Sequence, residues 1–141
     1  MSNWVPIGWV HNAIPFGTKP VDWKQVSSQI RIQSQFGEGL YGLDLFSHVY
    51  VIFLLENSEL RLKVHPCGRT DLPEVGLFAS RSPHRPNPLG LTLVHLLSVE
   101  GNTLHVAGLD AYDGTEVLDI KPFQLKRLPA ELKMPAWTDL L

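Results

Sequence analysis

Residues 91–109 have the sequence LTLVHLLSVEGNTLHVAGL, in which two apolar runs, 91–99 and 103–109, flank Glu100-Gly101-Asn102. Two apolar runs joined by a short turn that contains glycine are typical of a β-hairpin. We therefore expect two antiparallel strands to pair here.

Strand-like segments continue on both sides of this hairpin. Residues 30–36 and 60–64 alternate apolar and polar side chains, which indicates strands with one face in water. The run 49–55 is apolar throughout and predicts a strand buried on both faces. The other expected elements are strands at 4–11 and 117–120 and a short helical turn at 38–45.

Six or seven strands with short connections and almost no long helix favour an all-β barrel or sandwich. No strands alternate with long amphipathic helices, which argues against a doubly wound parallel sheet. A Rossmann nucleotide site has no support, because the G-x-G-x-x-G spacing at residues 37–42 is not part of a strand–helix–strand unit. We expect a single, mainly β domain over residues 1–123, followed by a tail or short helix at 124–141.

The composition narrows the class of protein. The chain has 141 residues, of which 44% are hydrophobic and 18% charged, as in ordinary soluble globular domains. Its formal net charge of −2 argues against a generally basic nucleic-acid binder. Cys67 is the one cysteine, so an intramolecular disulfide is excluded and a reducing, cytoplasmic setting fits. We expect no signal peptide and no membrane span, because the start lacks a basic, then apolar, pattern and the run 49–55 is too short.

A stiff polar segment precedes the hairpin. Residues 81–90, RSPHRPNPLG, contain two arginines and three prolines. Each proline fixes φ and removes a backbone donor, so a regular helix or central strand is excluded. Apolar residues at 75–79 and 91–99 flank the segment. A rigid polar loop between two core strands is a good platform for a binding site.

The side chains of this segment suit an anionic ligand. The guanidinium groups of Arg81 and Arg85 match a carboxylate or a phosphate. Asn87 can recognise an amide or a base edge, and Ser82 adds a hydroxyl. Residues 61–87 carry five cations and two anions, a net charge of +3 in an acidic chain. The alternatives are arginines that cap loop carbonyls and charges that are simply solvated.

An acidic bend follows the hairpin. Asp110-Ala111-Tyr112-Asp113-Gly114-Thr115 is followed by Asp119, so three aspartates lie within ten residues. Asp-Gly is a common turn pair, and a turn alone is the alternative interpretation. The carboxylates would also attract a positively charged centre such as a sulfonium. The histidines lack a zinc-like set of partners, so we expect no metal, and a single cysteine gives little support to a nucleophilic role.

Two long blocks resemble the TsaA-like (TrmO-type) family. They are FASRSPHRPNPLGL at 78–91 and GLDAYDGTEVLDIKPF at 108–123. Shorter matches are Ile7-Gly8 and GLDLFSH at 42–48, so the resemblance covers roughly residues 4–123. It implies a compact β-barrel domain, a homodimer, and S-adenosylmethionine bound without a Rossmann fold. The implied activity is N6-methylation of threonylcarbamoyl-adenosine in the anticodon loop of tRNA.

The resemblance also implies site residues. The implied cofactor-binding residues are Arg81, Ser82, Leu91, Asp110, Tyr112, Asp113, Gly114 and Thr115. Arg85 and Asn87 would shape the same site on the substrate side, and Asp110 or Asp113 would serve as the catalytic base. The arginine segment and the acidic bend are then expected to meet in one pocket.

Three departures from the family pattern leave alternatives open. A Pro-Arg-Gln cofactor element is replaced by GTKPVDW at 17–23, where Lys19 or Trp23 is the candidate substitute. A family histidine is replaced by Glu56-Asn57, and the C-terminal extension thought to grip tRNA is not present after Leu141. Cofactor binding is thus better supported than tRNA as substrate. The alternatives are a module that binds the cofactor or a nucleoside, and a methyltransferase for a small non-tRNA substrate.

Overall fold

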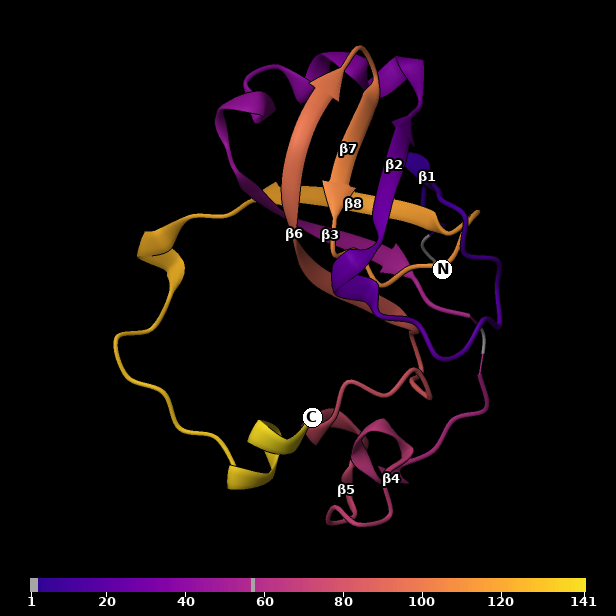
Figure 1. The fold of residues 1–141 in the computed structure, drawn as a ribbon, viewed down its shortest axis with the longest axis vertical. Coiled ribbons are helices and arrows are strands. Elements are labelled where there is room, and N and C mark those ends of the chain that lie inside the picture. The colour runs from indigo at the N-terminus through magenta and orange to yellow at the C-terminus, as the bar shows by residue number, and fades with distance from the viewer. Residues whose placement is uncertain (1–2, 57) are drawn as a thin grey trace. The chain divides into compact units, whose positions relative to one another are not determined.

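The computed structural model describes residues 3–56 and 58–141, which form two units (Figure 1). One unit comprises Met1–Leu55 and Gly90–Phe123, and the other comprises Glu56–Leu89 and Gln124–Leu141. Asn57, part of one of the predicted departures from the family, lies outside the described residues. Within the described chain, no helix is long and apolar enough to cross a membrane.

The first unit is a closed barrel, visible in Figure 1. Among the described residues, six strands follow one another around it in the order β1-β2-β7-β6-β3-β8. The strands are β1 (Gly8–His11), β2 (Ser27–Ile32), β3 (His48–Leu54), β6 (Leu89–Glu100), β7 (Thr103–Ala107) and β8 (Glu116–Pro122). Closure pairs every strand on both sides and removes free sheet edges. The prediction of a mainly β barrel is confirmed.

Alternating apolar side chains fill the barrel. The side chains with no exposed surface include Val10, Ile30, Val49, Val51, Leu104, Val106 and Val117. Gly90, at the end of the arginine segment, is required by this packing. A Cβ at position 90 would lie 2.4 Å from Cζ of Phe53, a core side chain that is 2% exposed. The glycine therefore lets β6 pass close to the core.

The central hairpin is confirmed, with a tighter turn than expected. Glu100 pairs with Thr103, so the turn consists of Gly101 and Asn102 alone. Gly101 has a φ of 60°, a conformation that glycine adopts without strain. The sequence interpretation that 49–55 is buried on both faces is wrong. β3 alternates buried and half-buried residues because one of its faces lines the barrel and the other faces outward.

Several expected strands are shorter than their apolar pattern. The N-terminal strand begins at Gly8, and Lys63–Val64 (β4) is the only strand within 60–64. The strand expected at 30–36 is β2, after which the chain turns into the 3-10 helix η2 (Ser34–Leu40). The helical turn expected at 38–45 falls in η2 and η3 (Leu43–Leu45). A further 3-10 turn, η1 (Trp23–Gln25), precedes β2.

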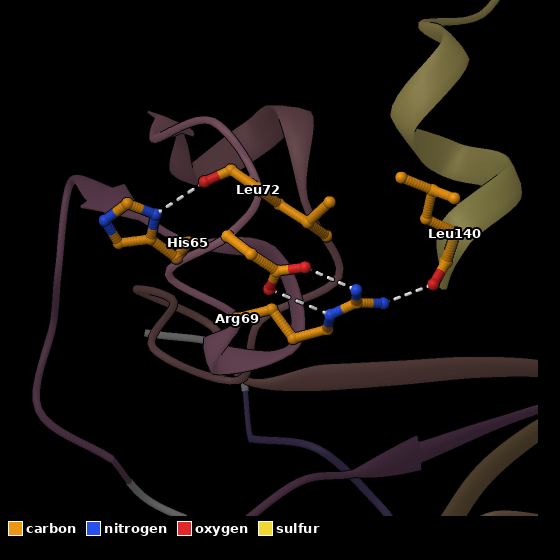
Figure 2. Close-up of polar contacts among 5 residues, drawn as sticks. His65, Arg69, Leu72 and Leu140 are labelled. Carbon is orange, nitrogen blue, oxygen red and sulfur yellow. Dashed lines mark hydrogen bonds and ion pairs between the residues drawn. The ribbon is translucent and has the colours of Figure 1, made fainter.

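The second unit has little regular structure. β4 pairs antiparallel with β5 (Val75–Gly76), and four 3-10 turns complete it. These turns are η4 (Pro66–Gly68), η5 (Leu77–Ala79), η6 (Leu125–Arg127) and η7 (Ala136–Leu140). Arg69 donates to the carboxylate of Asp71 and to the carbonyl oxygen of Leu140, as Figure 2 shows. These contacts tie η7 to the 66–74 loop. The domain boundary expected at residue 123 stays a prediction.

Candidate functional site

The acidic bend lies between β7 and β8 and is held by the loop that follows β1. The amide of Asp113 donates to the carbonyl of Ile14 (2.8 Å), and the amide of Gly114 donates to the carbonyl of Val10 (2.8 Å). Gly114 has a φ of 86°, which favours glycine at this point of the turn. The bend is therefore more than a local turn, because a segment about a hundred residues away in the sequence fixes its backbone.

Asn12 joins the two segments through its side chain. Its amide nitrogen Nδ2 donates to the carbonyl of Ala111 and to Oγ of Ser28, both at 2.9 Å. Its Oδ1 accepts from the amide of Ile14 (2.9 Å), and its own backbone amide donates to Oδ1 of Asp113 (3.0 Å). Asn12 is not among the site residues that the sequence predicts. The available signal was weak: an asparagine directly after a strand, where its side chain can bond the backbone two residues on.

An aromatic cluster borders the bend. Tyr112 is half-buried and meets Phe16 and Trp23 edge-on, with ring centroids 5.4 and 5.3 Å apart. Its hydroxyl donates to the carbonyl of Thr18 (3.1 Å). Aromatic faces beside carboxylates attract a cationic centre and can pack on a nucleobase. Trp23 thus contacts a predicted cofactor residue, although its substitution for the family's Pro-Arg-Gln element stays a prediction.

The remaining bend residues complete this half of the site. Asp110 is exposed and accepts a 2.5 Å hydrogen bond through Oδ1 from the hydroxyl of Thr92 on β6. Leu91, the preceding residue on β6, is 46% exposed. Thr115 donates from its hydroxyl to the carbonyl of Tyr112 (2.7 Å). The structure therefore brings the bend and the start of β6 together within the barrel unit.

The arginine segment belongs, up to Leu89, to the second unit. Arg85 is half-buried, and its Nη1 donates to the carbonyls of Leu77 (3.3 Å) and Ser82 (2.9 Å). Its guanidinium carbon lies 6.0 Å from the centroid of the Phe78 ring. Arg85 thus caps loop carbonyls, as the alternative interpretation expected. Its predicted role on the substrate side stays a prediction.

The other predicted residues of this segment differ in exposure. Ser82 is half-buried, and its hydroxyl oxygen accepts from the amide of His84 (3.3 Å). Arg81 and Asn87 are exposed. Because these residues lie in the second unit and the bend lies in the barrel, the predicted single pocket formed by both segments stays a prediction.

Each unit has a hollow of its own. The second unit holds a pocket of about 360 Å³ whose lining includes Arg61, His65, Glu74, Ser82 and His84. The barrel unit holds an apolar hollow of about 400 Å³ beside η2 and η3. Nowhere in the described ranges do three His, Cys, Asp or Glu side chains gather so that they could hold a metal ion.

The chain is a β-barrel domain without a Rossmann sheet, and its two marked features are the acidic bend and the proline-stiffened arginine segment. The chain belongs to the tRNA-methyltransferase O N-terminal domain family, whose model matches residues 11–127. The family predicted from the two sequence blocks is confirmed.

Individual relatives agree with this assignment. A "Probable S-adenosyl-L-methionine-binding protein" of Methanothermobacter thermautotrophicus is 42% identical over 84% of this chain and 87% of its own length. A mouse protein named "tRNA (adenine(37)-N6)-methyltransferase" is 39% identical over 84% of this chain. A solved structure titled "Crystal structure of TrmO" has a TM-score of 0.75 at 30% identity, over 95% of this chain and 63% of that one.

Relatives differ in length. The match spans 30% of the mouse protein and 26% of another "Probable S-adenosyl-L-methionine-binding protein", from Archaeoglobus fulgidus, which is 45% identical over 67% of this chain. The shared part is therefore the barrel-containing domain.

Proposed function

We propose that this chain is an S-adenosylmethionine-dependent methyltransferase that acts on N6 of an adenosine in tRNA. The observation that carries the proposal is the family match over residues 11–127. The names of the mouse and archaeal relatives support the reaction and the cofactor.

The residues present fit such a cofactor. Asp110 and Asp113 are exposed and use Oδ1 in the hydrogen bonds described above, which leaves Oδ2 of each carboxylate for a ligand. Tyr112 lies between Asp110 and Asp113 in the sequence and adds an aromatic ring to the bend. In the proposed site these residues hold the cofactor together with Ser82, Gly114, Thr115, Leu91 and Arg81.

The cofactor supplies an electrophilic methyl group on a sulfonium. The protein's part is to align the acceptor nitrogen with that methyl group and to exclude water. Arg85 and Asn87 shape the substrate side, and Asp110 or Asp113 accepts the proton that leaves N6. A strong base is not needed, because the N6 nitrogen loses its proton readily once it carries the methyl group.

The finer features of the proposal follow the family. We assign threonylcarbamoyl-adenosine as the acceptor, a cytoplasmic location, a barrel domain at 1–123 and a homodimer. Three exposed leucines on β6 support the dimer, since Leu91, Leu93 and Leu97 are 46%, 43% and 49% exposed. Exposed apolar residues that gather on one element can mark an association surface, and a second copy of the chain would cover these leucines.

Calorimetry with S-adenosylmethionine tests the cofactor assignment. Arg81→Ala is expected to weaken binding about ten- to a hundredfold, because a hydrogen bond to a charged group contributes about 1.5–3 kcal/mol. Arg31→Ala is the matched control, since Arg31 is an exposed arginine on β2 whose guanidinium bonds Gln29. Equal affinity of wild type and Arg81→Ala would show that Arg81 does not bind the cofactor. No binding by wild type would overturn the cofactor assignment itself.

A second candidate function is cofactor binding without tRNA methylation. It is favoured by the archaeal relative of nearly the same length, whose name states binding alone. Mass spectrometry of tRNA nucleosides after incubation with protein and cofactor separates the two. A new N6-methylated nucleoside supports the methyltransferase, and an unchanged nucleoside profile with intact cofactor binding supports the second candidate.

A further inference from the structure

The pocket of the second unit has an unusual set of side chains. It lies between β4, the η4 turn and the arginine segment, and measures about 360 Å³. Its lining includes Arg61, Lys63, His65, Cys67, Glu74 and His84. Two permanent cations and two histidines thus face a single carboxylate, Glu74, in a chain whose net charge is −2.

Both histidines of the pocket have a fixed tautomer. Nδ1 of His65 lies 2.9 Å from the carbonyl oxygen of Leu72, as Figure 2 shows, and Nδ1 of His84 lies 2.9 Å from that of Glu59. A carbonyl oxygen can only accept, so Nδ1 carries the hydrogen in each ring. Each ring thus joins its own segment to a loop carbonyl of the same unit.

The frame of the pocket is stiff. Proline occupies positions 66 and 83, and the amide of Arg61 donates to the carbonyl of His84 (3.2 Å). β4 and β5 pair through Lys63 with Gly76 and Val64 with Val75. A site ordered before its ligand arrives loses less conformational entropy on binding.

We propose that this pocket binds a phosphodiester group of the RNA substrate, an inference that rests on the proposed function. The guanidinium of Arg61 and the ammonium of Lys63 offer charged donors to phosphate oxygens. The volume lies at the lower end of small-molecule pockets, which suits one phosphate with its ribose. In an acidic chain, a local cationic hollow is where a polyanion gains most from contact.

The test measures binding of a fluorescein-labelled tRNA anticodon stem–loop by anisotropy, from about 50 to 200 mM salt. Arg61→Ala/Lys63→Ala is expected to weaken binding about tenfold and to reduce the slope of log affinity against log salt by about one. Both side chains are exposed, so the variant keeps its fold. The control is Lys126→Ala/Lys133→Ala, which removes the same charge from exposed positions outside the pocket and is expected to change affinity about twofold or less.

A second variant tests the histidines. His65→Gln/His84→Gln removes the ring contacts with the carbonyls of Leu72 and Glu59 and leaves Glu74, Cys67, Arg61 and Lys63 in place. It is expected to weaken RNA binding, because the pocket then loses part of its frame. An affinity equal to that of wild type overturns the role of the histidines.

The outcomes separate this inference from the proposed function. Equal losses in the pocket and control pairs, or no RNA binding at all, overturn the pocket assignment even when cofactor binding is intact by calorimetry. RNA binding that depends on the pocket, in a protein that neither binds the cofactor nor methylates, removes the proposed function and leaves the pocket assignment in place.

Discussion

Each of the two units of this protein is stabilised by a different kind of interaction. Within the described residues, thirteen buried hydrophobic side chains form the barrel core, whereas the second unit buries Val64, Leu72 and Leu77. The second unit relies instead on prolines, on the carbonyl caps of Arg85 and on the contacts of Arg69. The barrel is thus stabilised by burial of apolar surface, and the second unit by local stiffness and polar bonds.

This difference assigns different tasks to the two units. A closed barrel with an apolar core gives a rigid base, and Asn12 fastens the acidic bend to it. The second unit carries exposed arginines and the cationic pocket on a frame with few buried contacts. Elements with few buried contacts open more readily than a packed core, so the second unit is expected to lose its protection from hydrogen exchange before the barrel does.

Phe53→Ala is the substitution with the largest expected effect, which is a loss of stability of the barrel unit. Phe53 is 2% exposed and packs against Gly90, so its truncation leaves a cavity in the barrel. The expected cost is about 3–5 kcal/mol in the free energy of unfolding, measured by urea denaturation. Tyr41→Ala is the control, because Tyr41 is 98% exposed and its loss is expected to cost less than about 0.5 kcal/mol.

Leu77→Ala provides the counterpart in the second unit. Leu77 is 2% exposed there, and its truncation is expected to speed hydrogen exchange in 58–89 while the barrel amides keep their protection. Loss of protection in both units at once would show that they unfold as one, against the comparison drawn here.

Asn12→Ala is the next largest expected effect and concerns the site. It removes the side-chain bonds to Ala111, Ser28 and Ile14, which leaves partly buried polar groups unpaired at a cost of about 1–3 kcal/mol. The bend is then expected to loosen, so the affinity for S-adenosylmethionine falls about tenfold in calorimetry. Asn12→Asp keeps the Oδ1 acceptor for Ile14 but loses the donor to Ala111, so an intermediate affinity is expected.

Local patterns predicted most of the barrel but only part of the site. The hairpin around Gly101 and the apolar strands follow from periodicity, which is a property of neighbouring residues. The outer face of β3 was misread because an apolar run does not tell how much of a strand other elements cover. The bonds between Asn12 and the bend join residues about a hundred positions apart, and no local pattern carries such a pairing. The two sequence blocks located the candidate residues, whereas the partners that hold them came from the structure.

The smallest expected effect is a pH response of the second unit near Arg69. The hydrogen bond from Arg69, together with its positive charge, holds the pKa of the Asp71 carboxyl below its ordinary value of 3.8. A lowered folded-state pKa contributes stability that is present above 3.8 and is lost as pH falls through the folded value. Arg69 also bonds the carbonyl of Leu140. Once the Asp71 carboxyl is protonated, we therefore expect hydrogen exchange of the η7 amides to become faster relative to the intrinsic rate. Asp71→Asn removes the titrating group and is expected to remove the pH response, so an equal response in this variant would assign it to another carboxyl.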